Sequence, residues 1–236
     1  MLKQPRIRED YLLRITGDLD QSIDETLLLG WHEKWPDDNS PLIGLAKIAL
    51  RSGRTDEARE LADRFLAVYP NDPEAHVVKG KIELATSLTQ LPAWNKGLPE
   101  EAESHPGTWV VRGDWCQQAG HRQLAIRCFL ECMRLNPNDR VANLRLGQLL
   151  GEEQGQPFLD RAEKLRILFD LVTNAQKHSN PFQFWGLAES LQSLGRFREA
   201  VHWGQTAMTA SPHMMMRMTT DPEFAKSYHR IVAAAG

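Results

Sequence analysis

The feature of this 236-residue sequence that most restricts its fold is an internal repeat of 34 residues. Four segments align with one another without gaps, and each carries a proline near its end. The segments are 5–38, 39–72, 106–139 and 181–214, with Pro36, Pro70, Pro137 and Pro212. Self-similarity at a fixed period indicates stacked units, because one unit alone cannot bury its apolar face. We therefore expect a repeat protein.

Each unit repeats one physical pattern, which is clearest in 106–139. Two apolar stripes at helical spacing lie on either side of Gly120, and Pro137 follows the second stripe. The stripes are Trp109, Gly113, Cys116 and Ala125, Phe129, Cys132. The small residues Gly113 and Ala125 should let two helices approach closely. The pattern predicts an antiparallel helix pair in each unit.

These residues resemble the tetratricopeptide repeat (TPR) family, in which a bulky residue, Leu-Gly, a Tyr-like position, Ala, Phe and Pro recur. The sequence departs from that pattern at Arg112, at Cys116, and at Ala46 and Ala188 in place of Gly. We expect Arg112 to turn its charged head outward. The resemblance implies an all-α fold, a right-handed α-solenoid of about six antiparallel helix pairs with a C-terminal capping helix.

The rest of the chain fits this interpretation as less regular units of a single TPR-like solenoid over 1–236. The additional repeats are 73–105 and 140–180, and the cap is 219–235, opened by Asp221 and Pro222. Pro92, Gly97 and Pro99 should prevent a continuous helix around 88–98. The segment GEEQGQP in 140–180 is an insertion before an amphipathic run. Met214, Met215 and Met216 should fill space under the terminal helix.

Composition and motifs exclude several functional classes. The net charge is −3 and basic residues are scattered, so we expect no nucleic-acid partner. The polar N-terminus and the absence of an apolar run of about 18 residues predict no direct membrane insertion by this chain. Three cysteines, Cys116, Cys128 and Cys132, suit packing better than zinc or disulfides and favour a cytoplasmic, reducing compartment. The oligomeric state stays open.

No catalytic motif stands out in the sequence. It lacks the His-Glu-x-x-His, Gly-rich phosphate-loop and nucleophile-elbow patterns. Paired glutamates such as Glu100–Glu101 are better explained as solvated helix faces or helix starts. We therefore expect a non-enzymatic protein with no catalytic residue, no cofactor and no metal site.

The function that the TPR resemblance implies is binding of a partner's peptide or amphipathic helix on the concave face. Projection of the first helices gives its lining: Ile43, Lys47, Val77, Lys81, Val110, Asp114, Leu144, Arg145, Gln148 and Trp185. Relatives that grip a C-terminal carboxylate place Lys where this chain has Ile43, Val77 and Val110, so that activity is not expected. The alternative is a structural or assembly scaffold in a larger protein or complex, using the convex face or the ends.

The lining predicts the chemistry of the partner. Val77, Val110 and Leu144 should form an apolar stripe that Ile43 and Trp185 extend, with Lys47, Lys81 and Arg145 at its border. Such a surface suits apolar anchors with acidic neighbours. Trp185 would be the strongest anchor if exposed. For Val78 and Val111, burial between helices and exposure in a groove fit the spacing equally well.

Overall fold

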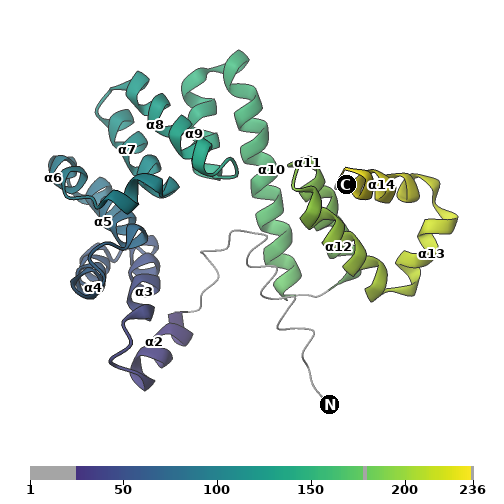
Figure 1. Ribbon diagram of the computed structural model, residues 1–236, viewed down its shortest axis with the longest axis horizontal. Helices are drawn as coiled ribbons and strands as arrows, with labels where there is room; N and C mark the ends of the chain where they lie inside the picture. The colour runs from purple at the N-terminus through teal and green to yellow at the C-terminus, as the bar shows by residue number, and fades with distance from the viewer. Residues whose placement is uncertain (1–24, 178–179, 235–236) are drawn as a thin grey trace. The chain divides into compact units, whose positions relative to one another are not determined.

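The computed structural model describes residues 25–177 and 180–234, and these form helices and turns with no strand (Figure 1). Their contacts divide the chain into two compact units, one of which spans Ile23–Leu159 and the other of which contains Asp160–Gly236. The all-α prediction is confirmed. The single solenoid over 1–236 stays a prediction, and each unit is described by itself below.

The first unit begins with the second helix of the predicted repeat 5–38, whose first helix lies outside the described residues. Its elements are α2 (Glu25–Lys34), α3 (Ser40–Arg51), α4 (Thr55–Val68), α5 (Pro73–Thr86), η1 (Leu88–Gln90), α6 (Leu91–Lys96), η2 (Glu100–Ser104), α7 (Pro106–Gln118), α8 (Arg122–Leu135) and α9 (Arg140–Leu150). The helix α10 (Glu152–Lys177) runs across the boundary. The second unit continues with α11 (Pro181–Ser193), α12 (Phe197–Ala210), α13 (Pro212–Thr220) and α14 (Pro222–Ala233).

Three helix pairs, α3/α4, α7/α8 and α11/α12, share one turn. Gly53, Gly120 and Gly195 stand at its corner with φ of 76°, 79° and 77°. The next backbone N–H bonds back to the carbonyl five residues earlier, as in His121 N to Cys116 O at 2.8 Å. This is the Schellman termination of a helix, which needs a left-handed residue and so favours glycine. The turn reverses the chain in three residues and makes the paired helices antiparallel.

Aspartates after the repeated prolines start the next helices. Asp72 Oδ1 accepts a hydrogen bond from Ala75 N at 2.8 Å, and Asp139 Oδ1 accepts one from Ala142 N at 2.8 Å. These are N-caps, which satisfy a backbone donor that the first helical turn leaves free. The proline ends one pair, and the aspartate two residues later begins the next.

The pair α7/α8 packs through the residues that the sequence pattern singles out. Ala125, Phe129 and Cys132 are fully buried. A Cβ placed on Gly113 would lie 2.5 Å from Phe129 Cε1, so the ring covers the glycine directly. The prediction of a tightly packed helix pair in 106–139 is confirmed.

The second half of the repeat 73–105 lacks a continuous helix, as predicted. Two short 3₁₀ turns flank the six-residue α6, whose Trp94 is buried and donates from its indole N–H to His76 O at 2.8 Å. Trp94 also covers Gly80 on α5, where an added Cβ would lie 2.6 Å from the ring. One indole therefore packs where a full second helix would lie.

The prediction for Arg112 is wrong. Its guanidinium does not turn outward but points to the irregular segment, where it donates to Asn95 Oδ1 at 2.7 Å and to both carboxylate oxygens of Glu103 at 2.8 and 2.6 Å. It also lies over the ring of Trp109 at 4.6 Å. The Arg112 guanidinium finds these partners because α6 is short, which leaves the polar groups of the irregular segment within reach of α7.

The insertion GEEQGQP lengthens a helix, since its residues 152–157 form the first turns of α10. Gly151 has a φ of 83° and separates α9 from α10. A Cβ on Gly155 would lie 2.1 Å from Gly147 O, so the two backbones touch where these helices cross. No larger residue than glycine fits at this crossing.

The second unit ends in two helices. The one opened by Asp221 and Pro222 is present as α14, and Asp221 caps it by accepting from Phe224 N at 3.1 Å. The helix α13, which begins at Pro212, was not predicted from the sequence. The prediction for the methionines is also wrong, since only Met214 of the three is buried and Met215 and Met216 are exposed.

Candidate partner-binding face

Charged side chains of successive first helices meet along one side of the first unit. Lys47 Nζ on α3 lies 2.9 Å from Glu74 Oε1 on α5, and Glu74 Oε2 lies 3.0 Å from His105 Nε2. His105 is the N-cap of α7, and its Nδ1 accepts from Gly107 N at 3.2 Å. In the neutral ring the proton is then on Nε2, which donates to Glu74. One carboxylate thus links three helices.

The pKa of Glu74 reflects these partners. Burial would raise it, but the hydrogen bond from His105 and the charge of Lys47 outweigh burial and lower the pKa from 4.5 to about 2. Glu74 is therefore ionised throughout the neutral range. The Lys47 charge is largely compensated inside the protein.

A second group of charges joins α7 and α9. Asp114 Oδ1 lies 2.9 Å from Arg145 Nε. Burial raises the pKa of Asp114, while Arg145 and the nearby Lys81 act in the opposite direction. Lys81 is exposed and forms no ion pair within 4.0 Å among the residues described. A partner would therefore meet Lys81 as a free positive charge.

The apolar stripe predicted for this face is not exposed. Val77 and Val110 keep only 1% and 6% of their surface, because Val77 packs with Leu91 and Trp94, and Val110 with Phe129 and Leu146. For Val78 and Val111 the sequence fitted burial and exposure equally well, and both side chains are buried. These valines support the surface from beneath.

The remaining predicted residues divide between the two units. Ile43 and Leu144 are half-buried, and Gln148 is exposed. Trp185 belongs to the second unit and is buried, with its ring 4.2 Å from that of Phe224 and 6.3 Å from that of Tyr228 on α14. Trp185 was expected to act as an anchor only if exposed, and that condition is not met, because α14 covers its ring.

Two members of this face were missed from the sequence. Glu74 lies seven residues before Lys81 and so shares its side of α5, but the projection of that helix began at Val77. His105 precedes its helix and acts through the cap. The first-helix face is defined here as Ile43, Lys47, Glu74, Lys81, His105, Asp114, Leu144, Arg145 and Gln148.

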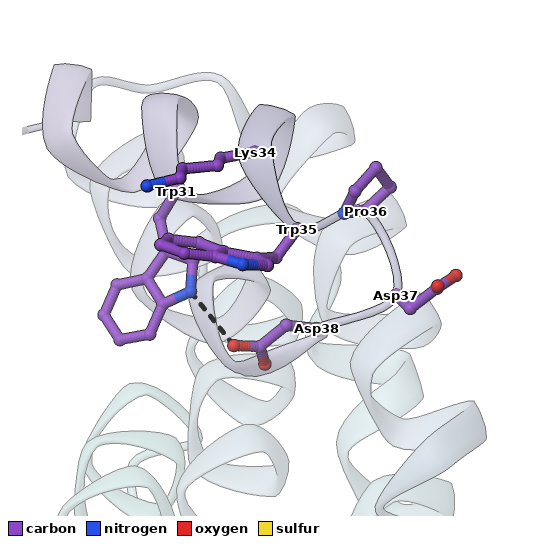
Figure 2. A pocket seen from close by; sticks show the side chains of 6 residues that line it. All are labelled: Trp31, Lys34, Trp35, Pro36, Asp37 and Asp38. Carbon is purple, nitrogen blue, oxygen red and sulfur yellow. Dashed lines mark hydrogen bonds between the residues drawn. The ribbon is translucent and has the colours of Figure 1, made fainter.

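A separate open pocket lies where α2 turns into α3. Figure 2 shows its lining: Trp31, Lys34, Trp35, Pro36, Asp37 and Asp38. The indole N–H of Trp31 donates to Asp38 Oδ2 at 3.0 Å. The two indoles meet edge to face, with ring centroids 6.1 Å apart.

The cysteines behave as packing groups. Burial raises the pKa of Cys128 to about 11, helped by the neighbouring Cys116 thiol, and burial also raises the pKa of Cys132. Within the described ranges no cluster of three or more His, Cys, Asp or Glu side chains could hold a metal ion. None of the helices described there is both long and apolar enough to cross a bilayer.

Comparisons with known proteins find a family model and solved structures to which the chain is similar. Residues 26–82 match the family model described as tetratricopeptide repeat. A crystal structure of a thermophilic TPR protein in Thermus thermophilus is 21% identical, with 83% of this chain and 100% of that chain covered and a TM-score of 0.48. A mutant of MamA is 17% identical, with 69% and 99% covered and a TM-score of 0.38. No curated protein matches the sequence.

Tetratricopeptide repeats generally mediate protein–protein interaction or assembly. The match begins in α2 and ends in α5, so it covers the pair α3/α4 and both of its neighbouring helices. The pairs α7/α8 and α11/α12 repeat the turn and the small-residue packing of α3/α4. Residues 26–82 are therefore similar to the tetratricopeptide repeat family, and the two later helix pairs repeat the same turn.

Proposed function

We propose that the first-helix face binds a segment of a partner protein and that the chain acts without catalysis. The supporting observation is that Lys81, Arg145 and Gln148 stand at the surface above a fully packed layer of valines. A rigid base lowers the entropy lost on binding, because the backbone that carries the contacting side chains is already ordered.

The charges of the face indicate the chemistry of that segment. Lys47 and Arg145 are paired with Glu74 and Asp114, whereas Lys81 has no ion pair within the described part of the chain. Lys81 and Arg145 both lie near Asp114, so an acidic side chain of a partner would meet both. Half-buried Ile43 and Leu144 offer small apolar contacts beside them. The segment that fits is acidic with apolar neighbours, and its binding should weaken with salt.

Photocrosslinking in cells tests the location of the site. A benzophenone amino acid is placed at Lys81 or Gln148, and at Arg127 on the outer side of α8 as a matched control, since Arg127 is also exposed. We expect the same partner segment to be captured at Lys81 and Gln148 and not at Arg127. Capture at Arg127 alone would overturn the proposal and favour the scaffold alternative, in which the convex face makes the contact.

The captured segment then serves as the ligand for purified protein. Lys81→Glu should weaken its binding by about tenfold, since one favourable charge pair becomes repulsive. Arg127→Glu changes the net charge equally and should leave the affinity unchanged. Equal effects of the two variants would show a nonspecific charge effect and contradict the proposal.

A further inference from the structure

The pocket at the end of α2 combines two exposed indoles with fixed negative charge. Trp31 and Trp35 keep 47% and 50% of their surface, and their planes meet at 70°. The hydrogen bond to Asp38 holds Trp31 in place, so its open face is presented in one orientation. A fixed aromatic side chain loses little conformational entropy when a ligand packs on it.

A cation already occupies one of the two rings. Lys34 Nζ lies 4.3 Å from the centroid of Trp35 (Figure 2). No cation lies over Trp31 in the part of the chain that the structure describes. The face of an indole carries negative charge and attracts cations. The contact of Lys34 with Trp35 therefore indicates that the aromatic surface of this pocket suits a cationic group.

The carboxylates of the pocket favour the same kind of group. Hydrogen bonds from Ser40 hold the pKa of Asp38 below its usual value, so this side chain stays ionised. Asp37 is exposed and lies next to it in the same turn. The two carboxylates outweigh Lys34, and the net charge of the lining is negative. An anionic ligand would be repelled.

The equivalent turn of the next repeat lacks these properties. Phe65 and Tyr69 stand 34 residues after Trp31 and Trp35, with rings 4.8 Å apart. Phe65 is buried with Leu42 and Ala75, and the turn that follows has Asn71 where the first turn has Asp37. Only the first of these two turns combines open aromatic surface with two carboxylates.

We propose that Trp31, Trp35, Asp37 and Asp38 bind an arginine side chain of a partner protein. A guanidinium is planar and stacks on an indole face while its N–H groups reach carboxylates. Lysine offers a point charge without the planar contact, so arginine fits better. This site is independent of the first-helix face and of the acidic segment proposed for it.

The probe is the peptide acetyl-Gly-Arg-Gly-amide, and its matched control carries citrulline, which has nearly the same shape and no charge. Binding is followed by the indole N–H resonances of Trp31 and Trp35, with buried Trp203 as the internal reference. We expect the arginine peptide to shift both resonances in a saturable way at millimolar concentrations, as suits a single side-chain contact. The citrulline peptide should not shift them.

Two variants separate the contributions. Trp31→Leu should weaken binding of the arginine peptide, detected at Trp35, by about two- to fivefold, the usual size of an exposed cation–π contact. Asp37→Asn should weaken it less. Equal shifts from the two peptides, no effect of Trp31→Leu, or no shift at all because another part of the chain covers the indoles would each overturn the proposal. None of these results bears on capture at Lys81.

Discussion

The repeats 73–105 and 106–139 of the first unit bury the inner side of their first helix in different ways. In 106–139, a full second helix buries Ala125, Phe129 and Cys132 against α7. In 73–105, the six-residue α6 buries Leu91 and Trp94 against α5. One repeat uses many small contacts along a helix, and the other uses one large ring and a few hydrogen bonds.

The difference shows what a helix-pair repeat requires. The first helices α5 and α7 are nearly equal in length and pack directly on each other. The second helix mainly has to cover the small residues of the first, as Phe129 covers Gly113 and Trp94 covers Gly80. A repeat can lose most of its second helix if one large side chain covers the same position.

The largest effect that we expect in this comparison comes from Val110→Glu in the regular repeat. It would place a carboxylate among the buried side chains of Phe129, Cys132 and Leu146, which cannot compensate its charge. The free energy of unfolding should fall by at least about 3 kcal/mol, as measured by urea titration. Leu130→Glu on the exposed side of α8 is the control and should be nearly neutral. A normal melt of Val110→Glu would contradict the burial described here.

Alanine in place of glycine compares the two repeats directly. Gly113→Ala drives a methyl group into the Phe129 ring and should cost about 1–3 kcal/mol. Gly97→Ala lies after α6, where the nearest atom would be Ala93 O at 3.4 Å, and should change stability by less than about 0.5 kcal/mol. Equal costs in thermal melts would mean that the position after α6 is packed as tightly as the glycine that Phe129 covers.

Arg112→Ala tests the hydrogen bonds that replace the missing helix. It removes the bonds to Asn95 and Glu103, and we expect a loss of about 1–2 kcal/mol. Amide hydrogen exchange over 88–104 should accelerate more than that over 122–135. Arg127→Ala, without these bonds, is the matched control. Uniform acceleration along the chain would show a global effect instead.

The last prediction concerns how the free energy of unfolding depends on pH in the acid range. The folded-state pKa of Glu74, about 2, lies below its ordinary value of 4.5, so its ionisation stabilises the folded state above pH 4.5. That contribution should be lost as the pH falls from about 5 towards 2. Glu74→Gln should flatten this part of the stability curve. The raised pKa of Asp114 acts with the opposite sign, so Asp114→Asn should steepen it.

Periodicity predicted the helix pairs because glycine, alanine and proline act locally. The positions of Gly120 and Pro137 determine where helices end whatever surrounds them. The exposed residues of the binding face were harder to predict than the helices. Val77 and Lys81 lie on the same helix, and the packing of the neighbouring helices determines which of the two side chains is buried. Arg112 was misread for a similar reason, because Asn95 and Glu103 lie in a segment without periodicity. The burial of Trp185 could not be predicted, because it results from packing against α14, and the spacing of residues does not show what α14 packs on.

The shared turns at Gly53, Gly120 and Gly195 make the helix pairs exchangeable parts. Each turn has the same left-handed corner and the same pair of backbone hydrogen bonds, so a second helix from one repeat can be joined to a first helix of another without a new linker. The hydrogen bonds that the three junctions share join backbone atoms only. The junctions are therefore natural fusion points for engineered chimeras, in which the charged surface of one repeat is transferred whole to another.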